Sequence, residues 1–168
     1  HTKYNSWQFC SGQEGDPWIG QVRDPEIPEE VLGVKYRAGG GRVKQQSAID
    51  NREDGQPLQP APLWRQDWVN RSFMQQEEQQ PQPKTFAKGL DFIQRNAEDD
   101  QWFLQIETFD PHEPFFTQQK YKDLHPHDYD GPHFDWPPYG LSDRTPEQDA
   151  HVRYEYAALI SMCDHYLG

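Results

Sequence analysis

A short, bulky run of residues, WFLQIE at 102–107, most constrains the fold, because it has the length and side chains of a buried strand. A helix is predicted from Thr85, since apolar residues recur along one face at Phe86, Leu90, Ile93 and Ala97. An acidic loop at 98–100 separates the helix from the strand. Helix, loop and strand in this order predict an α/β fold, in which ligands bind beyond the carboxyl ends of the strands.

A long proline-rich loop and a second helix follow the predicted strand. Residues 110–146 hold seven prolines and four histidines without an apolar period, which indicates a loop. The sequence TPEQ at 145–148 is typical of a capping box, so a helix is predicted to begin there. Its apolar stripe comprises Val152, Tyr156, Leu159, Ile160, Cys163 and Leu167. The order helix, strand, loop and helix predicts part of a layered α/β sandwich.

Loops dominate the first 60 residues, where glycine and proline are frequent and no period is sustained. We expect an exposed loop or insertion at 33–62, which contains a glycine triplet with high backbone entropy. A one-sided helix is predicted from Trp64 to Gln80, ending before Pro81.

Side chains that build a core are scarce in this chain. Leu, Ile, Val and Phe together make 30 of 168 residues, below the roughly 20% expected of chains that fold alone. Six Trp, eight Tyr and nine Phe nevertheless indicate folded material. We therefore expect 1–168 to be a single partial domain, incomplete on its own, that packs against segments outside it.

Charge and hydropathy exclude several partners. The formal net charge of -12 disfavours binding to nucleic acid or to an anionic membrane. The apolar runs are far shorter than the roughly 20 residues that span a bilayer. Cys10 and Cys163 are too few for a disulfide scaffold and too far apart for a zinc knuckle, so both are predicted to be plain thiols.

His112 is the candidate site residue, because it directly follows the predicted strand. Pro111 and Pro114 on its two sides stiffen the backbone, which suits a side chain that contacts a ligand. Its ring could bind a sulfate or phosphate oxygen or protonate a leaving oxygen, with Asp110 or Glu113 orienting the other nitrogen. The alternative is a loop histidine satisfied by backbone carbonyls.

Two other polar segments are weaker candidates. His125, His127 and His133, with acidic residues between them, could form a metal cluster, but Pro126 and Pro132 scatter them along a loop, so no metal ligands are predicted. The glycine-spaced segment 12–18, with Glu14, Asp16 and Trp18, is predicted to be a plain turn in preference to a pocket wall.

The second half of the chain resembles the bacterial sulfatases of the alkaline phosphatase superfamily. The resemblance is carried by WFLQIETFDPHEPF at 102–115, Tyr121, PPY at 137–139 and YEYAALISMCD at 154–164. It covers mainly residues 84–168, and residues 5–18 look like a less diagnostic upstream part of the same enzymes. The resemblance implies a central sheet between helices and hydrolysis of sulfate esters by a formylglycine nucleophile.

By this resemblance the chain is an internal piece of an arylsulfatase-like enzyme. The family's formylglycine motif does not occur here, and its calcium ligands lie outside this chain. Only His112 matches a functional family residue, the histidine of the His-x-Pro loop, which implies a catalytic and substrate-binding role at the sulfate group. The chain alone is expected to be inactive.

Three alternatives remain open from the sequence. A phosphodiesterase or a phosphonate monoester hydrolase of the same superfamily shares the histidine loop and differs in nucleophile and metal. A non-catalytic glycan-binding module would use exposed aromatic side chains for stacking on sugar rings. The sulfate ester, the oligomeric state and the cellular compartment are not predicted.

Overall fold

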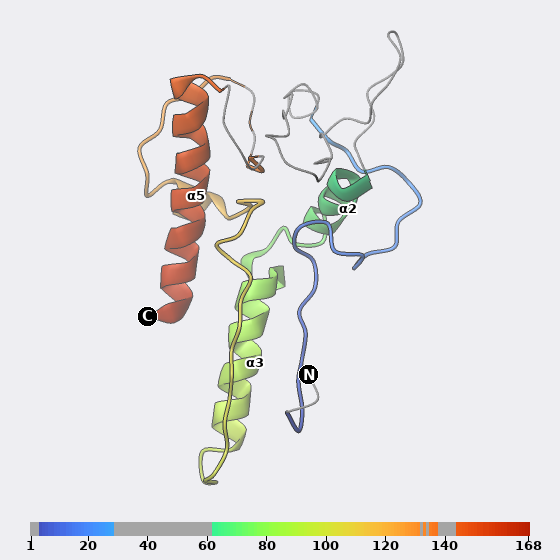
Figure 1. Ribbon diagram of the computed structural model, residues 1–168, viewed down its shortest axis with the longest axis vertical. Coiled ribbons are helices and arrows are strands. Elements are labelled where there is room, and N and C mark those ends of the chain that lie inside the picture. The colour runs from blue at the N-terminus through green and yellow to red at the C-terminus, as the bar shows by residue number, and fades with distance from the viewer. Residues whose placement is uncertain (1–3, 29–61, 132, 134, 138–143) are drawn as a thin grey trace, which may run out of the picture.

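The computed structural model describes residues 4–28, 62–131, 133, 135–137 and 144–168 (Figure 1). All regular elements in these ranges are helical: α2 (Pro62–Arg71), the 3-10 helix η1 (Glu77–Gln79), α3 (Pro81–Arg95), α4 (Gln119–Lys122) and α5 (Pro146–Leu167). No strand occurs in this part of the chain. The predicted α/β sandwich layer is therefore wrong for the described residues. The loop predicted at 33–62 lies, except for Pro62, outside them.

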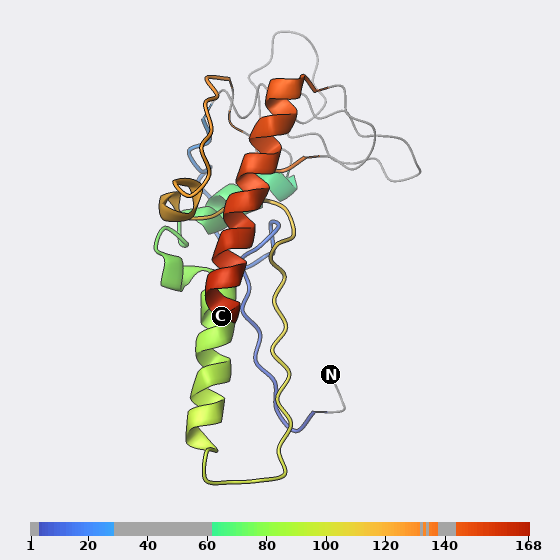
Figure 2. The same cartoon turned by 90° about the vertical axis from the view of Figure 1, so that its left-hand side faces the viewer.

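The segment predicted as a buried strand, 102–107, is extended but belongs to no sheet. It runs alongside α3 (Figures 1 and 2), with Trp102 edge-on to Phe92 at 5.5 Å between ring centroids. Its backbone makes no hydrogen bond to another described segment, and Phe103 is 73% exposed. An extended segment forms a strand only when a neighbour completes the hydrogen-bond ladder. The run of bulky residues therefore predicted the extended backbone correctly, but the described residues provide no second strand to pair with it.

Helix α3 confirms the prediction of a helix through 85–95 and begins four residues earlier, at Pro81. Proline is favoured in the first turn, where its missing N–H costs nothing. Gly89 lets the extended segment approach, because a Cβ atom there would collide with the side chain of Ile106. The expected apolar face is largely in solvent, with Leu90 55% and Ile93 38% exposed.

Helix α2 ends at Arg71, nine residues before the predicted end at Gln80. The N–H groups of residues 72–74 each donate to the carbonyl three residues earlier, which tightens the chain and terminates the helix. A separate turn, η1, then begins with a capping box between Gln76 and Gln79. The gap between the two helices redirects the chain before α3.

Helix α5 begins with the predicted capping box. The Gln148 amide donates to Thr145 Oγ1 at 3.3 Å, and the Thr145 amide donates to Gln148 Oε1 at 3.0 Å. The buried face is rotated from the predicted stripe, since Tyr156, Ile160 and Leu167 are exposed. It consists of His151, Val152, Glu155, Ala158, Leu159, Met162 and Cys163.

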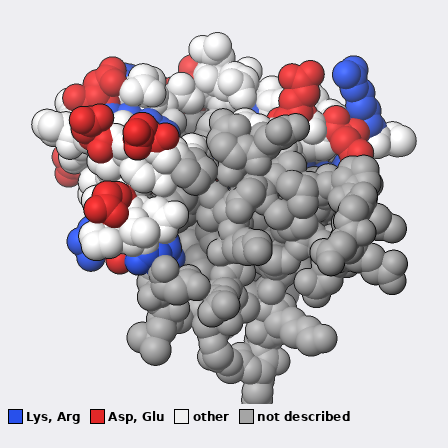
Figure 3. Space-filling model, turned by 90° about the horizontal axis from the view of Figure 1, so that it is seen from above, with Lys and Arg blue, Asp and Glu red and all other residues white. Residues whose placement is uncertain are grey.

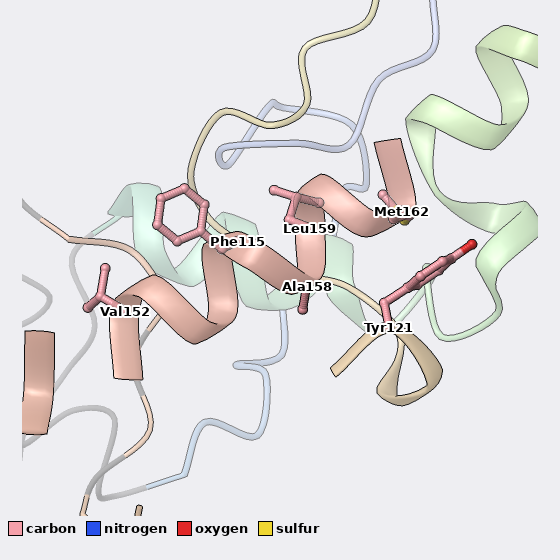
Figure 4. Packing of buried hydrophobic residues seen from close by; sticks show 6 residues of the cluster. All are labelled: Phe115, Tyr121, Val152, Ala158, Leu159 and Met162. Carbon is pink, nitrogen blue, oxygen red and sulfur yellow. The ribbon is translucent and has the colours of Figure 1, made fainter. Parts of the chain in front are cut away.

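The main core forms where α5 meets the loop that precedes it. Figure 4 shows Phe115 from the loop and Tyr121 from α4 against four residues of α5. The four are Val152, Ala158, Leu159 and Met162. A second, smaller cluster surrounds Trp64 of α2, which stacks on Trp136 at 5.3 Å between ring centroids. Both clusters lie away from the C-terminal end of α3, which projects from the rest of the described chain (Figure 1).

Two further observations concern the charge of the surface and the apolar character of the helices in the described part of the chain. On the face in Figure 3, Lys and Arg side chains are interspersed with Asp and Glu and form no continuous basic patch among the described residues. None of the described helices combines the length and the apolar character needed to cross a bilayer.

Candidate functional site

His112 lies in a tight turn between the extended segment and the core. Its backbone N–H donates to the Phe109 carbonyl at 3.1 Å, and its ring lies 4.1 Å from the Phe109 ring. Nδ1 lies 2.7 Å from the Glu113 carbonyl oxygen. Because a carbonyl oxygen only accepts, Nδ1 carries the proton in this contact. The turn holds one ring nitrogen through the backbone, as the flanking prolines Pro111 and Pro114 led us to expect of a stiff segment.

Acidic side chains surround this turn. Glu113 Oε2 lies 3.5 Å from His112 Nδ1, and the buried Glu113 Oε1 has no hydrogen-bond partner among the described residues. Glu14 comes from the segment predicted as a plain turn. Burial raises the pKa of Glu14, the positive charge of His112 opposes this rise, and Glu113 and Asp16 add to it. The fold therefore brings 12–18 close to the His112 turn, where Gln13 donates a hydrogen bond to Asp110, and no local pattern indicates this proximity.

Asp110 connects the same N-terminal segment to a small cavity. It is buried and accepts a hydrogen bond from Gln13, and burial raises its pKa to about 6 despite that bond and the charge of His112. The cavity has a volume of about 20 Å³, room for about one water molecule. The buried Gln80 side chain lines it and makes no hydrogen bond within the described residues. The remaining lining residues are Gln13, Asp67, Met74, Pro81, Asp110, Pro114 and Phe116.

A buried ion-pair triad adjoins this cavity, since its member Asp67 lines it. Arg71 donates from Nε to Asp67 at 2.7 Å and from both terminal nitrogens to Asp135, at 2.6 and 3.1 Å. Burial raises the pKa of Asp67 to about 6 although Arg71 opposes the rise, whereas Arg71 and His133 hold the pKa of Asp135 well below its usual range. The triad connects α2 to the proline-rich loop. Within that loop, the Phe115 backbone N–H donates to the Asp135 carbonyl at 2.8 Å.

Four polar residues form what we call the histidine cluster: His127, His133, His151 and Glu155. His127 Nε2 lies 3.1 Å from His151 Nδ1, and His133 Nδ1 lies 3.2 Å from His151 Nε2. Burial, with the nearby His133 and His127, lowers the pKa of His151 to about 4. Two loop histidines, His127 and His133, thus contact His151 of α5. The sequence analysis considered only residues of the loop as metal ligands and did not include His151. The spacing of His151 and Glu155, i and i+4, was the available signal.

The other histidines of the loop lie outside this cluster or serve other contacts. His125 Nε2 lies 2.9 Å from the Ser161 hydroxyl on a different part of α5.

Within the described residues, three side chains of the cluster could hold a metal ion: His133, His151 and Glu155. Calcium takes six to eight oxygen ligands, so two imidazole nitrogens and one carboxylate do not fit it. The calcium that the sulfatase resemblance implies therefore has no site among these residues.

Comparison of the chain with protein-family models, with curated proteins and with solved structures found no match in any of the three. The resemblance to sulfatases stays a prediction that depends on the residues quoted for it.

Proposed function

We propose that this chain is part of a sulfuric ester hydrolase of the sulfatase family and that His112 binds the sulfate group of the substrate. The observation that supports the proposal is the Glu113 carboxylate beside the ring: its Oε2 lies 3.5 Å from His112 Nδ1, and the Glu113 carbonyl lies 2.7 Å from the same nitrogen. These contacts engage Nδ1 with the protein, and in this proposal Nε2 is the nitrogen that meets the sulfate group. The ring is then oriented by the backbone, as a residue that must meet a small anion requires.

In its charged form the His112 ring carries a proton on each nitrogen. Nε2–H can then donate to a sulfate oxygen or transfer its proton to the bridging oxygen as the S–O bond breaks. Glu113 and Glu14 lie close enough to balance the positive charge of the ring. In this proposal the nucleophile and the metal ligands lie outside this chain.

The test is a comparison of substrates and variants in the full-length protein. Wild type, His112→Ala and His125→Ala are assayed with an aryl sulfate and with a phosphodiester of the same phenol. We expect preference for the sulfate ester and a fall in kcat/KM of about a hundredfold or more in His112→Ala, the range for a proton donor or a charge-stabilising group. His125→Ala, a substitution in the same loop, should stay close to wild type.

Three outcomes would contradict the proposal. A preference for the phosphodiester would assign the protein to the phosphodiesterase or phosphonate monoester hydrolase branch. Equal activity of His112→Ala and wild type would make His112 a loop histidine satisfied by backbone carbonyls. Glycan binding without turnover of either ester would favour the non-catalytic binding module.

A further inference from the structure

We propose that His133, His151 and Glu155 form a binding site for a zinc-type divalent cation. His133 comes from the proline-rich loop, and His151 and Glu155 come from adjacent turns of α5. The site is separate from the His112 turn and does not depend on the function proposed for it. Its ligand chemistry, two imidazoles and one carboxylate, is a common zinc set.

The distances between the three ligand atoms match the size of a zinc ion. His133 Nδ1 lies 3.2 Å from His151 Nε2 and 3.4 Å from Glu155 Oε1, and the third separation, His151 Nε2 to Glu155 Oε1, is 3.9 Å. A point equidistant from three atoms at these separations lies about 2.0 Å from each, close to the Zn–N and Zn–O bond lengths of about 2.0–2.2 Å. The side chains would need little movement to bind the ion.

These three atoms lie so close to one another that a proton or a cation must lie between them. The carboxylate oxygen only accepts, and a neutral imidazole offers one accepting nitrogen and one donating nitrogen. If His151 donates from Nδ1 to His127 Nε2, at 3.1 Å, then His151 Nε2 presents a lone pair to the centre of the triangle. A single proton or a metal ion can fill this position, and the test below separates the two.

The outer contacts are those that support metal ligands. Histidine ligands are usually oriented by a hydrogen bond from the ring nitrogen that does not bind the metal. His127 serves His151 in this way, and Asp135 Oδ2 lies 3.8 Å from His133 Nε2. Lys122 Nζ lies 2.7 Å from Glu155 Oε2 and leaves Oε1 for the metal. Each of the three ligands thus has a partner on its far side.

The site has three protein ligands and access to solvent. Glu155 and His151 are buried, whereas the His133 side chain is 37% exposed. A fourth position is then filled by water, the pattern of open zinc sites as opposed to closed structural ones. Imidazole ligands select zinc, copper, nickel or iron over calcium and magnesium, so the cation is expected to be of the zinc type.

The experiment measures zinc binding to the full-length protein. The protein is stripped with a chelator, kept in excess calcium to saturate oxygen-only sites, and titrated with ZnCl₂ by calorimetry. Wild type is expected to bind one equivalent that calcium does not displace. His133→Gln is expected to raise the Kd at least about a hundredfold, since loss of an outer-shell partner alone costs 10- to 100-fold. His125→Gln, in the same loop and outside the triangle, should bind as wild type does.

Three results would overturn the proposal: no stoichiometric zinc on wild type, which leaves only a proton in the triangle; an unchanged Kd in His133→Gln; or an equal loss in the His125→Gln control. Circular dichroism checks that both variants keep their helices. Should His133→Gln not fold, X-ray absorption at the zinc edge of wild type decides the question. Two imidazole nitrogens and oxygen at about 2.0–2.2 Å support the site, and a shell without two imidazoles overturns it.

Discussion

The two long helices of this protein have similar sequence signals and opposite surroundings. Helix α5 buries one face in the main core, where Leu159 is completely inaccessible to solvent. Helix α3 forms, with the extended segments 4–11 and 101–109, what we call the arm (Figure 2). It leaves Leu90 55% and Ile93 38% exposed. An apolar period therefore predicts a helix in both places, but it does not predict whether a partner covers the apolar face.

The same contrast applies to two ion pairs of identical spacing. Asp67 and Arg71 in α2 are fully buried and share their charge with Asp135, whereas Asp91 and Arg95 in α3 are mostly exposed. Both pairs join an aspartate to an arginine four residues later. Solvent screens the attraction within the exposed pair, whereas burial imposes a desolvation penalty on the charges of the buried pair.

The largest expected effect comes from breaking the buried pair. Arg71→Leu leaves Asp67 and Asp135 charged, buried and unpaired, and should lower the free energy of unfolding by about 3–5 kcal/mol. Arg95→Leu in the arm should change it by less than about 0.5 kcal/mol. Urea unfolding of the two variants of the full-length protein measures both values. Equal losses would show that the arm is buried as deeply as α2.

Truncation of one leucine in each helix tests the apolar faces directly. Leu159→Ala should cost about 2–5 kcal/mol, because it leaves a cavity in the core. Leu90→Ala should change the free energy of unfolding by no more than about 0.5 kcal/mol, since the side chain is half exposed and alanine favours helix. A loss above 2 kcal/mol for Leu90→Ala would mean that another surface covers α3 in solution.

Asp110, where the arm meets the core, provides a test against pH. Its pKa is raised to about 6 from 3.8, so the stability that it contributes is present below pH 4 and lost as the pH rises through 6. Asp110→Asn should remove this loss. The stability of the variant relative to wild type should therefore increase by about 2–3 kcal/mol between pH 4 and pH 7. A constant difference across this range would contradict burial of Asp110 as a carboxyl group.

The smallest expected effect concerns the helix ends. Thr145→Ala removes the side-chain acceptor that caps α5 and should cost about 1 kcal/mol. In the arm, the Thr85 hydroxyl donates to the Pro81 carbonyl inside α3, and Thr85→Ala should cost at most a few tenths of a kcal/mol. Thermal unfolding of the two variants compares them. A larger loss at Thr85 would reverse the comparison.

Local chemistry accounts for what could be predicted of the fold and the site. The capping box of α5 and the helical periods of α3 and α5 depend on residues within a few positions of one another, and each is present in the structure. The strand at 102–107 was wrong, because a ladder needs a second segment. The sequence analysis also placed the end of α2 nine residues too late. The helix ends at a tightened turn formed by the N–H groups of residues 72–74, and no glycine or proline marks that turn in the sequence.

By itself, the sequence determined that helices occupy most of 85–95 and 146–167, where α5 begins, and that His112 follows an extended segment. It did not predict α4, which lies inside the predicted loop 110–146. Only the tertiary structure decided that Glu14 lies near His112, that Arg71 joins Asp67 to Asp135, and that His133 meets His151 and Glu155. The physical reason is the range of the interactions. Helical hydrogen bonds and caps act over about four residues, whereas burial, ion pairs and metal-ligand geometry depend on how distant segments pack.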